Sequence, residues 1–146
     1  MRRSLAAMQR KAGVATDAAF AAFVAENPLE NIVVVDARNP DFSVEPGDAK
    51  WGAESTAPIA GTAAGAAAVP RPRAVNLVYD RVDSAMDLKP LQPLLTDGMD
   101  TPIITHCGGG GRGQKAKLFL ESAGYTNVIN GGGPKVRELW EQFGAL

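Results

Sequence analysis

The residues of this chain that could carry out chemistry are concentrated around its only cysteine, Cys107. The largely apolar run at 102–105 predicts a strand that ends just before this cysteine, and a glycine-rich turn containing Arg112 follows it. The backbone N–H groups of such a turn can point inward as a nest, and a helix that begins there adds partial positive charge. Positive potential of this kind stabilises a thiolate and binds oxyanions. The predicted site residues are the nucleophile Cys107 and, for substrate binding, Arg112, Gly108, Gly109, Gly110, Gly111 and Gly113.

A buried cysteine that packs as a small hydrophobic side chain is the alternative interpretation of Cys107. It leaves the glycines unexplained, because each glycine inside an element costs about 0.5–1 kcal/mol relative to alanine. A run of glycines is favoured only where the backbone itself is used, so we favour the reactive cysteine.

The glycine pattern also matches parts of two nucleotide-binding motifs. Gly108, Gly110 and Gly113 satisfy the dinucleotide pattern Gly-x-Gly-x-x-Gly. However, the next predicted strand ends at Asn130 without the acidic residue that would hold a ribose. The segment also begins like a phosphate-binding P-loop, but Gln114 stands where that motif needs lysine. Neither nucleotide-binding motif is therefore complete.

The elements that must position this segment follow from the hydrophobic pattern. Short helical patterns alternate with β-branched runs, which predicts an α/β domain with a mainly parallel sheet. Strands are expected at 32–35, 74–78, 102–105 and 127–129. Helices are expected from 16 or 17 to about 26, at 114–123 and at 134–143, with a helical tendency interrupted by prolines at 84–95. Ligands of open parallel sheets bind beyond the carboxyl ends of the strands, where Cys107 is expected.

Residues 43–73 differ in composition from the rest of the chain, since 17 of these 31 positions are Ala, Gly or Pro. A connection of this length without regular structure is unusual in a compact domain and is either functional or mobile. We expect a flexible surface insertion, with Trp51 as the side chain that would pin it. A lid over the site is the alternative.

The first 16 residues are basic, since they carry Arg2, Arg3, Arg10 and Lys11 without an acidic residue. We interpret 1–16 as a basic N-terminal arm ahead of a domain at 17–144, and the alternative is a short organellar targeting segment. The first interpretation places the protein in the cytoplasm. The second places it in an organelle, a mitochondrion or a plastid.

The composition excludes several classes of protein. The chain has 146 residues, of which 45% are hydrophobic, and a formal net charge of −1. These values are typical of one globular domain and argue against disorder and against a general nucleic-acid binder. One cysteine and one histidine exclude an intrachain disulfide framework and zinc sites built from several of these residues. The uncharged stretch at 57–70 is too short to span a bilayer. We therefore expect no cofactor, no metal, no nucleic-acid partner and no membrane association.

Several segments of the chain resemble the rhodanese family, the single-domain sulfurtransferases. They are the runs at 33–38 (VVVDAR), 74–77 (AVNL), 106–113 (HCGGGGRG), 124–128 (GYTNV) and 131–132 (GG), with Trp140 downstream. The run at 106–113 is the most specific, because it matches the family pattern Cys-x-x-Gly-x-Arg-Gly. The resemblance covers about residues 17–144 apart from the insertion. It implies a five-stranded, mainly parallel sheet flanked by helices on both faces, with a persulfide on Cys107 as the reaction intermediate.

The spacing between cysteine and arginine bears on the reaction that this resemblance implies. The related phosphatases and arsenate reductases have one more residue between the two, which lets the loop encircle a tetrahedral phosphate-like anion. Arg112 here follows Cys107 one position earlier. The shorter ring resembles that of sulfurtransferases, which take up one sulfur atom. A phosphatase or arsenate reductase is therefore the less favoured alternative.

The resemblance implies a role for each part of the cysteine segment. Cys107 would attack the outer sulfur of thiosulfate or a similar small anionic donor, and cyanide or a thiol would then remove the sulfur. The thiol would belong to a small molecule or to a protein acceptor. Arg112 would bind the donor's oxygens, and the N–H groups of 108–113 would hold the persulfide. A rhodanese-like module that only carries sulfur or docks a partner is the alternative, against which the presence of both Cys107 and Arg112 weighs.

Three further positions near the predicted site have less distinctive patterns. Asp36 and Arg38 follow a predicted strand, and we expect them to organise loops by hydrogen bonding, with a role around the site as the alternative. His106 is adjacent to Cys107 on a strand, so the two side chains point to opposite faces and no Cys–His catalytic pair is expected. Trp140 is expected in the core.

Overall fold

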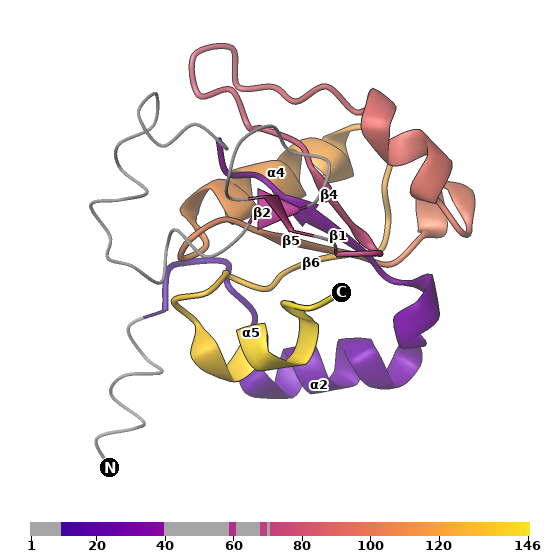
Figure 1. Ribbon diagram of the computed structural model, residues 1–146, viewed down its shortest axis with the longest axis vertical. Helices are drawn as coiled ribbons and strands as arrows, with labels where there is room; N and C mark the ends of the chain where they lie inside the picture. Colours follow the sequence, from indigo (N-terminus) through magenta and orange to yellow (C-terminus); the bar gives the residue numbers. More distant parts are fainter. Residues whose placement is uncertain (1–9, 40–58, 61–67, 70) are drawn as a thin grey trace.

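A computed structural model describes residues 10–39, 59–60, 68–69 and 71–146 of the chain (Figure 1). The prediction of a targeting segment falls largely on residues 1–9, outside the described residues. The predictions of a flexible insertion or a lid, and of Trp51 as its anchor, fall mostly on 43–58, 61–67 and 70, which also lie outside them.

The centre of the described chain is a four-stranded parallel sheet with the strand order β4-β1-β5-β6. The strands are β4 (Ala74–Asn76), β1 (Val33–Asp36), β5 (Ile103–His106) and β6 (Val128–Asn130), which confirms the four strands that the sequence predicts. Every residue of β1 and β5 is buried, as their apolar runs require for inner strands of a parallel sheet. Asp36 lies opposite both Asn76 and His106, so the carboxyl ends of β1, β4 and β5 meet at one edge of the sheet.

The expectation of a five-stranded sheet is wrong, because the described residues place four strands in it. The sequence offers only four apolar runs for the sheet, and the fifth strand came from the resemblance alone. Two short strands, β2 (Ile59–Ala60) and β3 (Ala68–Val69), pair in parallel with each other as a separate sheet. They therefore do not extend an edge of the main sheet.

Helices cover both faces of the main sheet (Figure 1). Helix α4 (Gly111–Ser122) lies on one face, and α2 (Asp17–Glu26) and α5 (Arg137–Phe143) lie together on the other. The strand residues alternate between the two cores, since Val33 and Val35 pack with α4 whereas Val34 packs with α2 and α5. The core residues contributed by the helices are Ala116 and Leu120 on the first face, and Phe20, Phe23, Leu139 and Phe143 on the second.

The helix boundaries show which local signals decide them. Helix α2 begins as predicted, because the Thr16 hydroxyl accepts a hydrogen bond from the Ala19 N–H at 3.0 Å. Helix α4 begins at Gly111, three residues before the predicted start, and α5 begins later than predicted, at Arg137. The helical tendency at 84–95 becomes the 3-10 helix η3 (Lys89–Leu94), in which Pro90 and Pro93 remove two backbone donors. The other 3-10 helices of the described chain are η1 (Leu29–Asn31) and η4 (Gly98–Asp100).

Residues 10–16, which belong to the predicted basic arm, pack against the domain. Arg10 forms ion pairs with Asp17 at 2.7 Å and with Glu138 of α5 at 3.3 Å. The Ala15 N–H donates to the carbonyl oxygen of Asn130 at the end of β6, at 2.9 Å. This part of the arm therefore lies at the same edge of the sheet as the carboxyl ends of its strands. Within the described ranges, no helix is long and apolar enough to cross a membrane.

The close packing of α5 on the sheet leads to a first prediction, for Gly131→Ala. A Cβ at Gly131 would lie 2.6 Å from Cε2 of Phe143 and 2.9 Å from Cγ2 of Ile104, which are both fixed in the core. We expect this substitution to lower the free energy of unfolding by about 1–3 kcal/mol, as measured by urea denaturation. Gly109→Ala is the control, because a Cβ there would meet its nearest neighbour at 3.7 Å. Equal stability of the two variants would contradict the packing described here.

Candidate active site

Cys107 directly follows β5, and the structure holds it at both its side chain and its backbone. Its Sγ accepts a hydrogen bond from the Gly110 N–H at 3.1 Å, and its own N–H donates to the Gly132 carbonyl oxygen at 3.1 Å. The residue is a free cysteine and is 4% exposed. A neutral thiol is a weak acceptor, whereas a hydrogen bond to an ionised sulfur is charge-assisted. The Gly110 N–H is therefore placed to bond to the thiolate, the form of cysteine that acts as a nucleophile.

The glycines of the loop from Cys107 to Gly113 meet different requirements. Gly110 is the N-cap of α4 with φ of +117°, and a Cβ there would collide with Val14. At Gly113 a Cβ would lie 2.8 Å from Oδ1 of Asn130 and 3.1 Å from Cα of His106, so α4 packs on the sheet backbone. At these two positions a side chain would clash with its neighbours, so glycine is needed for the backbone to take this course, as the sequence predicts. Gly109 and Gly111 are half-buried and leave the rim of the loop without side chains of its own.

Three basic residues surround the cysteine loop. Arg112 is buried in the first turn of α4. The Lys11 ammonium lies 3.5 Å from the position that a Cβ of Gly111 would take, and Cδ of Lys135 lies 3.7 Å from the corresponding position at Gly109. Sequence reasoning did not single out these lysines for the site. Lys11 is far from the motif along the chain, and Lys135 follows a different strand, so no local spacing connects them with Cys107.

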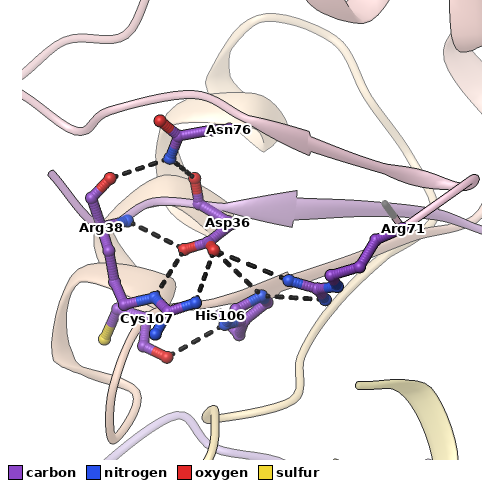
Figure 2. Close-up of polar contacts among 6 residues, drawn as sticks. All are labelled: Asp36, Arg38, Arg71, Asn76, His106 and Cys107. Carbon is purple, nitrogen blue, oxygen red and sulfur yellow. Dashed lines mark hydrogen bonds and ion pairs between the residues drawn. The ribbon is translucent and has the colours of Figure 1, made fainter. Parts of the chain in front are cut away.

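A second polar cluster lies at the carboxyl ends of β1, β4 and β5 (Figure 2). Asp36 and Arg38 are both fully buried and form a forked pair, in which Nε donates to Oδ1 at 2.9 Å and Nη2 to Oδ2 at 2.7 Å. The Asn76 amide donates to the carbonyl oxygens of Asp36 at 2.9 Å and Arg38 at 2.8 Å. Nη1 of Arg71 lies 3.6 Å from Oδ2 of Asp36. These contacts join the loop after β1 to the neighbouring strand by hydrogen bonds, the role expected for Asp36 and Arg38.

The comparison with protein families decides what kind of domain carries this site. A family model described as the Rhodanese-like domain matches residues 19–135. The chain belongs to the rhodanese-like family. No curated protein and no solved structure gives a match to it.

In this rhodanese-like domain, His106 connects the Asp36 cluster to the cysteine loop (Figure 2). Its Nδ1 lies 2.9 Å from the Cys107 carbonyl oxygen, and its Nε2 lies 3.3 Å from Nη2 of Arg71. A neutral ring with its proton on Nδ1 satisfies both contacts, because Nδ1 then donates to the carbonyl and Nε2 accepts from the arginine. His106 thus bonds to the backbone of Cys107, in line with the expectation that the two side chains diverge. Trp140 is half-buried rather than fully in the core, and its ring lies edge-on to His106, with centroids 5.0 Å apart.

Electrostatics keep this cluster ionised around a neutral histidine. Burial raises the pKa of Asp36, but three groups outweigh it and lower the pKa to about 2. They are His106, which contributes only when it is protonated in acid, and the permanently charged Arg38 and Arg71, of which Arg38 also donates hydrogen bonds. Burial lowers the pKa of His106 to about 3, since the arginines reinforce that effect and Asp36 only partly opposes it. At neutral pH, Asp36 is therefore a carboxylate and His106 carries no charge.

The rhodanese-like domain has no evident place for a metal ion in the described part of the chain. No group of three or more His, Cys, Asp and Glu side chains comes together there.

The residues missed by sequence reasoning are Arg71, Asn76, Asn130, Lys11 and Lys135. Arg71 and Asn76 supply contacts to Asp36, and Asn130 supplies contacts to the cysteine loop. The resemblance already contained Asn76, in the run at 74–77, but gave no reason to assign it a partner.

The neutral state of His106 predicts how stability depends on pH. Because the pKa of His106 falls from 6.5 to about 3 on folding, the unfolded chain binds a proton between these values that the folded chain does not. The free energy of unfolding should therefore decrease as the pH falls from about 6.5 toward 3. The contribution of Asp36 has the same sign but is lost only as the pH falls from about 3.8 toward 2.

Urea denaturation at a series of pH values measures this dependence. His106 is the only histidine, so His106→Gln should remove the slope just below pH 6.5, whatever its effect on stability at neutral pH. An unchanged slope in the variant would contradict a neutral, buried His106.

Proposed function

We propose that this protein is a sulfurtransferase that carries sulfane sulfur on Cys107. The donor is thiosulfate or a similar small anion, and the acceptor is cyanide or a thiol. The observation that supports this most is the hydrogen bond from the Gly110 N–H to Sγ of Cys107, at the start of α4. It offers a fixed donor and the positive end of a helix to an anionic sulfur.

Each half of the proposed reaction is a displacement at sulfur. The Cys107 thiolate attacks the outer sulfur of thiosulfate, the S–S bond of the donor breaks, and sulfite leaves with the bonding electron pair. Cys107 then carries a persulfide. An acceptor thiolate or cyanide attacks the outer sulfur of that persulfide. The bond between Sγ of Cys107 and the outer sulfur breaks, and its electron pair returns to Sγ as the Cys107 thiolate. The steps resemble thiol–disulfide exchange and need no general base, which agrees with a histidine that bonds to the backbone.

The charges around the loop suit an anionic donor. Arg112, Lys11 and Lys135 come from three different segments and surround the loop that bears Cys107. Positive potential at a site raises the local concentration of a dianion such as thiosulfate and the rate of its association. The half-buried glycines at 109 and 111 place no side chain of their own between the loop and a small donor or acceptor.

Steady-state transfer of sulfur from thiosulfate to cyanide, followed as thiocyanate, tests this proposal. Cys107→Ser should abolish turnover, because the oxygen nucleophile forms no persulfide. Arg112→Ala should lower kcat/KM for thiosulfate about 10- to 100-fold, the effect expected for loss of a charged hydrogen bond of about 1.5–3 kcal/mol. Lys117→Ala is the matched control, because Lys117 lies on the same helix and pairs with Glu121 at 2.9 Å.

Three results would contradict the proposal. They are the absence of transfer by the folded protein, transfer by Cys107→Ser, and equal kcat/KM for the Arg112 and Lys117 variants. The first would favour a docking module.

A further inference from the structure

The side-chain amide of Asn130 is one member of a closed ring of hydrogen bonds. The other members are Gly110, Cys107 and Gly132. Nδ2 of Asn130 donates to the Gly110 carbonyl oxygen at 3.0 Å, and Gly110 in turn donates its N–H to Sγ of Cys107 at 3.1 Å. Oδ1 of Asn130 accepts from the Gly132 N–H at 2.9 Å, and the Gly132 carbonyl accepts the Cys107 N–H at 3.1 Å. One side chain therefore bonds to both of the glycine residues whose backbones bond to the cysteine, Gly110 and Gly132.

The surroundings of Asn130 leave this side chain little freedom. The residue is fully buried at the end of β6, and its main-chain carbonyl oxygen accepts the Ala15 N–H at 2.9 Å. The absence of a Cβ at Gly113 makes room for its Oδ1, which would lie only 2.8 Å from such an atom. A buried amide held at both its oxygen and its nitrogen is a rigid support.

The two residues that Asn130 holds need such support. Gly110 and Gly132 have φ of +117° and +81°. Glycine adopts positive and negative φ about equally readily, so the residue alone does not select this conformation. With four successive glycines in the loop, little in the sequence itself orients the Gly110 N–H toward sulfur. The carbonyl of the same residue is fixed by Asn130 and by the Gln114 N–H at 2.9 Å, so the Gly110 residue has a defined orientation.

We infer that Asn130 is a positioning residue for the Cys107 thiolate, acting through Gly110 and Gly132. It touches neither Sγ nor the substrate in this account. It aims the Gly110 N–H at the sulfur, where that N–H can bond to a negative charge. The inference rests on the proposed nucleophilic role of Cys107 and adds the residue that prepares it.

Asn130→Asp separates this role from simple space filling. The carboxylate keeps the shape of the amide and the acceptor for the Gly132 N–H, but it replaces the donor that faces the Gly110 carbonyl with a second acceptor. The experiment follows the rate of Cys107 alkylation by iodoacetamide in the full chain as a function of pH. We expect the alkylation rate at neutral pH to fall about 10-fold in Asn130→Asp, because the Gly110 N–H is no longer held on the sulfur. Asn130→Ala, which adds no charge, should lower the rate as well.

Asn127→Asp is the matched control, since Asn127 lies just before the same strand and its Nδ2 donates to Oδ1 of Asn27 at 3.0 Å. It should alter stability without shifting the alkylation profile. A profile unchanged in whichever folded Asn130 variant is obtained, or an equal shift in the control, would overturn the inference. The alkylation needs no sulfur donor or acceptor, so its outcome is independent of whether the protein transfers sulfur.

Discussion

The arrangement of the site depends on the pairing of the buried Asp36 carboxylate with its basic neighbours. A charge removed from water is stable only when it is paired and hydrogen-bonded, and its partners are therefore drawn to one place. Arg38 comes from the loop after β1, Arg71 from the segment before β4, and His106 from the end of β5. Because His106 precedes Cys107 and bonds to its carbonyl oxygen, this cluster fixes the point at which the cysteine loop leaves the sheet.

Two sets of hydrogen bonds thus hold the cysteine loop, one from the charged Asp36 cluster and one from the neutral amide of Asn130. The Asp36 cluster fixes the backbone at Cys107, whereas Asn130 fixes Gly110 and Gly132 through amide hydrogen bonds alone. The sulfur itself meets an N–H group at the start of a helix. Such a donor would stabilise the negative charge of a Cys107 thiolate and of the proposed persulfide. In the proposed reaction, the surrounding lysines and Arg112 would bind the anionic donor.

The sequence was sufficient wherever a local pattern decides the structure. The β-branched run at 33–35 and the apolar run at 102–105 predict buried strands, and Thr16 predicts the start of α2 by its capping hydroxyl. The position of Cys107 at the end of a strand follows from the same patterns. Long-range contacts could not be predicted. Arg71 lies in a segment of low complexity, Lys11 in the basic arm, and Asn130 beside a glycine run, so nothing local links them to Asp36 or Cys107. The early start of α4 depends on Gly110 in the left-handed region, which the sequence permits but does not dictate.

The central claim is that Cys107 accepts a single sulfur atom, and intact-protein mass spectrometry tests it most directly. The full chain is incubated with thiosulfate, its mass is measured, and the measurement is repeated after cyanide or a thiol is added. The account predicts a gain of one sulfur atom that the acceptor removes, and no gain in Cys107→Ser. Cys107 is the only cysteine, so such a gain needs no further mapping. An unchanged mass, with Cys107 shown to be reduced and open to alkylation, would contradict the account.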